Sequence, residues 1–376
     1  MPQENKKKER VKKMIKFGKW VVKFRIPILI LSFLLLIPTG IIYMNTRINY
    51  DILSYLPGDI ETMKGQDILL DEFGTGAFSV AVIDGMQEKE ISQLEDKLKE
   101  IDHVKDVLWY GALADISIPM DMLPDDLKDS LQNADTGSQL MIITFDTSMS
   151  ADETLDAIEE IRGLTNEQCL LSGMSAVVTD IKKICNSEVI MYVVIAAGLS
   201  ALVLALTMDS FLLPFIFLLS IGMAIVYNLG TNFIAGEISF VTQALAAVLQ
   251  LAVTMDYSIF LWHSYLENQE RYPDDRKRAM SHAISQTLTS VVGSSITTIA
   301  GFLAMCFMTF TLGMDLGVVM AKGVVFGVIG CVTILPSMIL AMDKWIEKTR
   351  HKAIIPDLGP VSYTHLRAHE TVLDLV

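Results

Sequence analysis

The stretch LAVTMDYSIFL at residues 251–261 decides how this chain is built, because it places an acid inside an apolar segment. The acid is Asp256, Tyr257 follows it, and the apolar segment runs from about residue 239 to residue 262. About 20 apolar residues are enough to cross a bilayer. A charged Asp at mid-membrane costs about 2.5–3.5 kcal/mol on insertion scales. Asp256 is therefore either a proton carrier or a structural carboxyl that stays neutral and hydrogen-bonded to a neighbouring helix.

The composition excludes an ordinary soluble protein. The chain has 376 residues, a mean hydropathy of +0.42 and 51% hydrophobic residues. It lacks a phosphate-binding loop of the G-x-x-x-x-G-K-[ST] type and any evident catalytic constellation, so we expect no ATP hydrolysis and no enzyme. The four cysteines are scattered without metal-ligand spacing. We interpret them as packing residues and expect no metal and no cofactor.

The basic residues predict the orientation of the chain in the membrane. Residues 1–25 hold ten Lys/Arg and precede a first apolar span at 26–44, so the N-terminus is expected in the cytoplasm. This basic N-terminus also offers contacts to anionic lipid headgroups, although orientation is the favoured role. Basic residues recur at 267–283 and in a cytoplasmic tail at 344–359. With spans two to six placed at 188–343, every basic cluster is cytoplasmic, which predicts a multi-pass protein of the bacterial plasma membrane.

Residues 45–187 differ in character and predict an acidic domain outside the membrane. They hold ten Lys/Arg against 28 Asp/Glu. Strands are expected at 77–83 and 139–145, each followed by a helix with one apolar face. The sequence SADE at 150–153 is typical of a capping box that opens the second helix. We therefore expect an α-helical polytopic membrane protein of six transmembrane helices, with an α/β extracytoplasmic domain between helices 1 and 2.

Other polar side chains within the predicted spans are available to Asp256. Span five, from about residue 288 to residue 308, is rich in hydroxyls, among them Ser294, Thr297 and Thr298. Each hydroxyl either bonds a carbonyl of its own helix or reaches across to a carboxyl on span four. Gln250 lies on the same helix as Asp256 and extends the polar path. We name these four as candidate relay partners.

Span six carries two features of its own. Asp315 and Lys322 are expected near its outer end, where such side chains extend to the interface. The spacing of Gly323 and Gly327 is typical of helices that approach closely, and it indicates packing only.

The pair Asp256 and Tyr257 suits proton transfer. An Asp in hydrocarbon is most stable when protonated, and the Tyr hydroxyl is available to donate to its ionised form. A proton that crosses the membrane releases about 2.3 kcal/mol per 100 mV. Protonation and deprotonation of this carboxyl during proton movement could therefore drive transport, with protons as the coupling ion.

Four stretches, in order along the chain, resemble the N-terminal half of the MMPL branch of the RND (resistance-nodulation-division) transporter superfamily. They are INYDILSYLP at 48–57, the Asp256–Tyr257 pair, SITTIAGFL at 295–303 and TILP at 333–336. The resemblance implies a porter-like domain at 45–187 and proton-motive-force-driven export of lipids or other hydrophobic molecules. It also implies that Asp256 and Tyr257 form the proton relay. The partners it implies are membrane lipids, the hydrophobic substrate and a C-terminal repeat of the same transporter.

The sequence departs from that family pattern in two ways. Ala252 stands where the family often has Gly, which should only tighten helix packing slightly. The second, repeated half is missing. Residues 360–376, with VSYTHLRAHET at 361–371, resemble a translated sequencing adapter, so we expect a non-native tail on a truncated gene. On that view His365 and His369 are not metal ligands, and the relay is present but unable to turn over.

Two further functions remain open. One is a non-pumping, sterol-sensing-like lipid-binding or scaffold protein, and the other is an accessory subunit of protein export. The six-span layout serves both, although a lipid sensor would not need the Asp–Tyr pair. A homo-oligomer is compatible with each function, and we expect no nucleic-acid partner.

Overall fold

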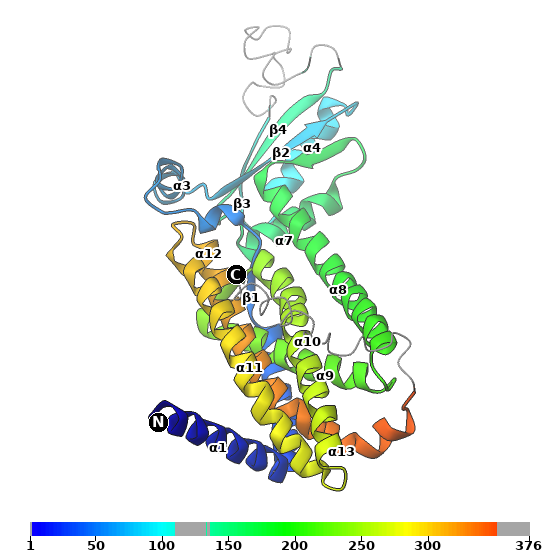
Figure 1. Cartoon of the computed structure of the whole chain (residues 1–376). Coiled ribbons are helices and arrows are strands. Elements are labelled where there is room, and N and C mark those ends of the chain that lie inside the picture. The colour runs from blue at the N-terminus through cyan, green and yellow to red at the C-terminus, as the bar shows by residue number, and fades with distance from the viewer. Residues whose placement is uncertain (1, 110–132, 134–135, 352–376) are drawn as a thin grey trace, which may run out of the picture.

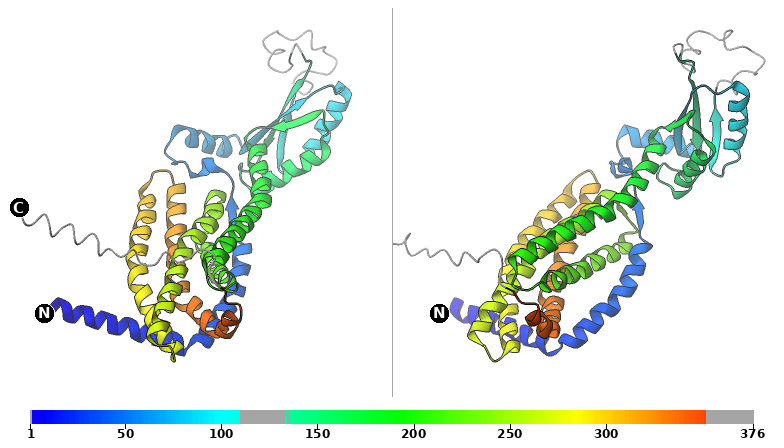
Figure 2. Two further views of the ribbon diagram at one scale, coloured as in Figure 1. Left: turned by 45° about the vertical axis from the view of Figure 1, so that its right-hand side comes forward. Right: turned by 90° about the vertical axis from the view of Figure 1, so that its right-hand side faces the viewer.

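The structure is a computed structural model, and it describes residues 2–109, 133 and 136–351. It consists of a bundle of long helices with an α/β domain at one end (Figure 1). The helix α1 lies across the opposite end of the bundle (Figure 2). The expected tail at 360–376 falls outside the described residues.

The α/β domain is built on a four-stranded sheet in the order β3-β4-β2-β5, with every neighbouring pair antiparallel. The residues of β2 alternate between buried and more exposed, as expected for a sheet with helices on one face. The two predicted strands are confirmed at the bounds given above. The apolar faces of both predicted helices are also confirmed as buried. The elements of this domain are α3 (Glu61–Asp71), β2 (Ala77–Ile83), α4 (Glu88–Lys99), β3 (Val104–Leu108), β4 (Gln139–Phe145), α7 (Asp152–Leu164) and β5 (Cys169–Ser172).

The predicted capping box at 150–153 is wrong. The residue that caps α7 is Ala151, without a side-chain hydrogen bond. The carbonyl oxygen of Ser150 instead accepts a hydrogen bond from Arg47 at 3.2 Å. A capping box does exist one helix earlier, where Gln87 and Glu90 bond reciprocally at the start of α4.

Within the described residues, the bundle contains six helical segments that are long and apolar enough to cross a membrane. The chain is therefore a polytopic membrane protein, as the hydropathy predicted. The last of these segments consists of two helices, Leu312–Ile329 and Leu335–Lys348, joined by a π-helical turn at Gly330–Ile334. The elements are α1 (Pro2–Lys23), α2 (Arg25–Met44), α8 (Met174–Thr207), α9 (Leu213–Gly230), α10 (Phe240–Arg271), α11 (Arg276–Ala304), α12 (Leu312–Ile329) and α13 (Leu335–Lys348), with short 3₁₀ turns at Ile52–Tyr55, Thr231–Ala235 and Met305–Phe307.

Two expected boundaries fall inside continuous helices. We expected the domain to end at residue 187, but α8 begins at Met174 and continues without a break into the bundle (Figure 2). The tail expected from residue 344 starts within α13, which ends at Lys348.

A short extended segment joins the domain to the bundle. Its strand β1 (Arg47–Asn49) pairs in parallel with β6 (Glu237–Ser239), which leads directly into α10. The Asn49 amide donates to the carboxylate of Glu237 at 3.0 Å, and the Tyr50 hydroxyl donates to Asn186 of α8 at 3.0 Å. The start of α10 is thereby fixed to the α/β domain.

Candidate proton-relay site

The site is built on α10, whose N-terminus is capped twice. The Ser239 hydroxyl accepts from the backbone N–H of Val241 at 3.2 Å. The carboxylate of Asp315 on α12 accepts from the backbone N–H of Ser239 at 2.8 Å and from the Thr242 hydroxyl at 2.6 Å. We expected Asp315 to extend to the membrane interface; instead it holds α10 and α12 together. Carboxylate acceptors at a helix N-terminus are favourable because unpaired N–H groups gather there.

Asp256 and Tyr257 point in different directions. Successive residues of an α-helix are turned by roughly 100°, so neighbours cannot share a face. Asp256 is exposed, whereas Tyr257 is only 4% exposed and packs in the bundle core. No hydrogen bond joins the two side chains, and none engages the Asp256 carboxylate within the described part of the chain. The exposed face that includes this carboxyl runs along α10 through Leu245, Leu249, Ala252, Asp256 and Phe260.

The helix α11 lies antiparallel beside α10 and brings its hydroxyls to the depth of Asp256. The register follows from the hydrogen bond of Ser264 on α10 with Gln286 on α11, at 2.7 Å. Moving the same number of residues along each helix brings Asp256 level with Ser294, because the rise per residue is equal. Ser294 and Thr297 are exposed, as Asp256 is. The outward surface of the two helices therefore holds Asp256, Ser294 and Thr297 at this depth, among exposed apolar side chains such as Ile296.

Of the two alternatives left open for the hydroxyls of span five, Thr297 and Thr298 adopt the local one, and no side chain among the described residues bonds Asp256. The hydroxyls of Thr297 and Thr298 both donate to the backbone carbonyl of Ser294, at 2.7 and 3.2 Å. This is the local alternative open to Ser and Thr in any helix, and it removes the need for a partner on another helix. Gln250 is 4% exposed and accepts from Asn228 inside the bundle, so it too lies away from Asp256.

A row of buried polar side chains runs between α9, α10 and α12, and the sequence analysis recognised only part of it. The Asn228 amide donates to the side-chain carbonyl of Gln250 at 2.9 Å. One turn further along, the ammonium group of Lys322 donates to the side-chain carbonyl of Asn232. Lys322 is thus held inside by Asn232, contrary to the expected extension to the interface. No local sequence pattern announced the row, because Asn228 and Gln250 are 22 residues apart in the chain and Asn232 and Lys322 are 90 apart.

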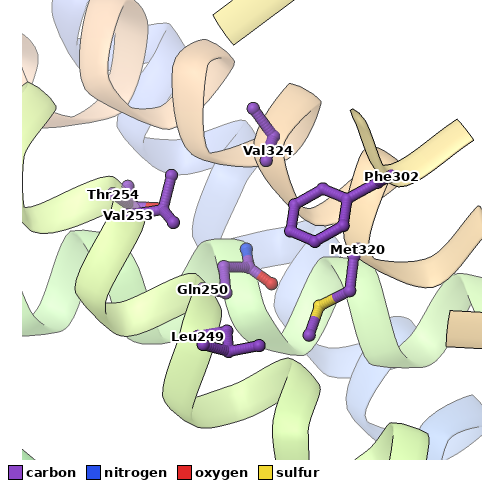
Figure 3. A pocket seen from close by; sticks show the side chains of 7 residues that line it. All are labelled: Leu249, Gln250, Val253, Thr254, Phe302, Met320 and Val324. Atoms are coloured by element: carbon purple, nitrogen blue, oxygen red, sulfur yellow. The ribbon is translucent and has the colours of Figure 1, made fainter. Parts of the chain in front are cut away.

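A small cavity adjoins this row (Figure 3). It offers about 10 Å³ to a water-sized sphere, close to the least that holds one water molecule. Two polar atoms of its lining residues, Nε2 of Gln250 and Oγ1 of Thr254, have no hydrogen-bond partner. The wall of the cavity itself is mainly apolar, and Gln250 and Thr254 are the polar residues among its lining. Its lining comprises Leu249, Gln250, Val253, Thr254, Phe302, Met320 and Val324.

Span six touches the candidate relay at an irregular point. Within the π-helical turn, the Cys331 thiol donates to the backbone carbonyl of Tyr257 at 3.2 Å. Gly327 lies one turn earlier, and a Cβ there would stand 2.5 Å from the Thr254 hydroxyl oxygen. Single π-helical turns inside longer helices occur frequently at functional sites. The described ranges hold no group of His, Cys, Asp and Glu side chains suited to a metal ion.

The fold and site define a polytopic membrane protein with a carboxyl group on the exposed face of a membrane-length helix. The MMPL family model matches residues 74–359, which is more than half of the chain. The chain therefore belongs to the MMPL family of the RND superfamily. This is a family of membrane transporters and not of enzymes.

Two individual relatives share about a quarter to a third of their residues with this chain over the matched stretches. The chain is 24% identical over 299 residues to the transport protein MmpL12 of Mycobacterium tuberculosis, covering 75% of this chain and 24% of that protein. It is 31% identical over 129 residues to the membrane protein ActII-3 of Streptomyces coelicolor, covering 34% of this chain and 18% of that protein. The chain thus spans less than a third of the length of either relative. Among solved structures, SecDF from Thermus is similar with a TM-score of 0.48 and 15% identity, covering 86% of this chain and 38% of that one.

Proposed function

We propose that this chain forms half of a proton-motive-force-driven exporter of lipids or other hydrophobic molecules, with Asp256 as its proton carrier. One observation supports the proposal above others. Asp256 lies within a membrane-length helix, on an outward face, and has no hydrogen bond or ion pair in the described part of the chain. An ionisable side chain in hydrocarbon is costly unless it has a partner, so this face is incomplete as it stands.

The missing partner is a second set of helices that covers the exposed face of α10 and α11. That face is shaped for a close approach, since a Cβ added at Gly293 or Gly301 of α11 would meet nothing within 4 Å. Small residues of this kind let helices pack closely in a membrane. We infer that an equivalent repeat, outside this chain, supplies both the helices and a second titratable group. The short span of the chain on its relatives is consistent with this inference.

The orientation of the protein follows from its charged residues. The basic residues of α1, the start of α11 and the end of α13 lie at the end of the bundle far from the α/β domain (Figure 1). Cytoplasmic loops are enriched in Lys and Arg. We therefore place the N-terminus in the cytoplasm and the acidic α/β domain outside the plasma membrane.

Transport by the intact exporter in proteoliposomes tests the proposal. A pH gradient should drive efflux of a fluorescent lipid in the wild type, and Asp256→Asn should abolish it while substrate binding persists. Asp274→Asn is the matched control, because it removes a carboxylate from the exposed α10–α11 turn. Proton-driven efflux that survives Asp256→Asn would sink the relay. Lipid binding by the wild type without any transport would favour a non-pumping sensor instead.

A further inference from the structure

The helix α1 crosses the start of α11 at the end of the bundle opposite the α/β domain (Figure 2). Residues of these two helices and of the connections beside them line a pocket of about 620 Å³. The two helices meet closely because Gly18 has no side chain, and a Cβ there would overlap with the backbone carbonyl of Ser281. The charged residues that line the pocket are Lys19, Lys23, Arg25, Asp275, Lys277 and Arg278.

These residues give the pocket a strong excess of positive charge. Five of them are cations and one is a carboxylate. That carboxylate, Asp275, already accepts the backbone N–H of Arg278 at 2.9 Å, where it caps α11. No ion pair between any of the five cations and a carboxylate exists in the described ranges. The guanidinium of Arg278 rests 4.4 Å from the centre of the Tyr272 ring, which keeps it at the pocket.

The same end of the bundle shows the opposite pattern on its other side. There Arg276 pairs with both Asp343 and Glu347 of α13. Arg350 pairs with Asp209 at 2.8 Å. Carboxylates of the chain therefore pair with the cations beside α13. At the pocket beside α1, five cations face a single carboxylate. Because the clustered cations repel one another, an anion from outside the chain would stabilise the pocket.

The surroundings of the pocket are those of a membrane surface. Trp20 of α1 is 50% exposed, and Phe24, which lies between α1 and α2, is 38% exposed. The exposed apolar surface of α2 begins directly at the pocket, since Arg25 lines the pocket and Ile26 is 57% exposed. Trp residues are enriched where bilayer and water meet. A ligand in this place meets cations at one end and apolar surface at the other.

We propose that this pocket binds the phosphodiester headgroup of an anionic phospholipid, with the acyl chains along the exposed apolar surface of α2. Lysine ammonium groups neutralise the phosphate, and the Arg278 guanidinium donates paired hydrogen bonds to its oxygens. The site is independent of Asp256 and of any transport activity. It also gives the basic helix α1 a binding role in addition to the orientation of the chain.

Lipid binding to the purified full-length chain in detergent tests the site by native mass spectrometry. The probes are phosphatidylglycerol, phosphatidylcholine with the same acyl chains, and glycerol 3-phosphate. The variants are Lys23→Gln with Arg278→Gln and, as a second pair, Lys19→Gln with Lys277→Gln. The matched control, Lys344→Gln with Lys348→Gln, removes two exposed charges of α13 at the same end of the protein.

We expect phosphatidylglycerol to bind the wild type and the control equally well, and to bind each pocket pair about 25-fold more weakly, at about five-fold per cation. Phosphatidylcholine should bind the wild type no better than it binds the pocket pairs. Three outcomes would overturn the proposal: equal binding of both lipids, an equal loss in the control, or displacement of the lipid by equimolar glycerol 3-phosphate. The last of these would identify a soluble phosphate as the ligand.

Discussion

Asn228 on α9 donates its side-chain amide to the side-chain carbonyl of Gln250 on α10 at 2.9 Å, and both residues are buried. Replacing Asn228 by Ala leaves that carbonyl without its partner inside the bundle, at an expected cost of about 1–3 kcal/mol. A double-mutant cycle with Gln250→Ala should give a coupling energy of about 0.6–1.7 kcal/mol, measured by unfolding in mixed micelles. Strictly additive losses would contradict the interaction.

Gly327 lets α12 approach α10. A Cβ at this position would stand 2.5 Å from the Thr254 hydroxyl oxygen, so Gly327→Ala must push the two helices apart. We expect a loss of about 1–3 kcal/mol, seen as a lower melting temperature in detergent. Gly198→Ala on α8 is the control, because a Cβ there meets nothing within 4 Å. That substitution should be neutral or mildly stabilising, and a similar loss at both positions would refute the packing argument.

The Asp315 carboxylate should slow hydrogen exchange at the start of α10. Asp315→Ala removes the acceptor of the Ser239 N–H and the Thr242 hydroxyl, at a cost of about 1.5–3 kcal/mol. Asp315→Asn keeps a carbonyl oxygen in place and should cost less. Hydrogen exchange at the Ser239 amide should quicken in the Ala variant. The Leu53 amide, which donates to Asp51 at 2.8 Å, serves as an unaffected reference, and unchanged exchange at Ser239 would count against the cap.

Asp51 provides a test of pH dependence outside the membrane. Burial raises the pKa of its carboxyl above the ordinary value of 3.8, although backbone N–H donors oppose the shift. A raised folded-state pKa means that the charged form is disfavoured on folding. This contribution to stability is therefore full at low pH and is lost as the pH rises through the folded-state pKa. Asp51→Asn, which retains an acceptor for Leu53, should melt higher than wild type at pH 7.

The advantage of Asp51→Asn should shrink as the pH falls toward 3.8, where the wild-type carboxyl is itself neutral. Thermal melts at pH 7 and pH 4 check this trend. Asp59→Asn, an exposed substitution in the same segment, is the control. A variant that is less stable than wild type at pH 7 would show that the charge of Asp51 is needed.

Local sequence patterns predicted the membrane spans and two of the four strands of the sheet, and they missed β3 and β5. The strands β2 and β4 follow from alternation, since every second residue must face the helices that cover the sheet. The membrane spans follow from length and apolar content. The family also followed from short motifs, among them the pair Asp256 and Tyr257, because their order along the chain is itself specific.

The faces of helices were harder to predict. Asp256 was expected to have partners within the bundle, but its direction depends on which face of α10 packs against α9 and α12. Tyr257 and Thr254 occupy that packed face, which turns Asp256 outward. The prediction that Lys322 extends to the membrane interface was wrong for a related reason. Its partner Asn232 lies in a turn ninety residues earlier, and such a long-range pair leaves no local pattern.

The unbroken course of α8 has a mechanical consequence. At 1.5 Å per residue, its 34 residues form a rod of about 50 Å. Its first turns are buried in the α/β domain at Ser175, Ala176, Val178 and Thr179, whereas most of its later residues are exposed. A continuous helix resists bending, so the positions of its two ends are mechanically coupled. Each degree of tilt displaces the far end, near Thr207, by about 0.9 Å. The α/β domain and the far end of α8, where Leu204 is buried in the bundle core, are thus connected by one continuous helix.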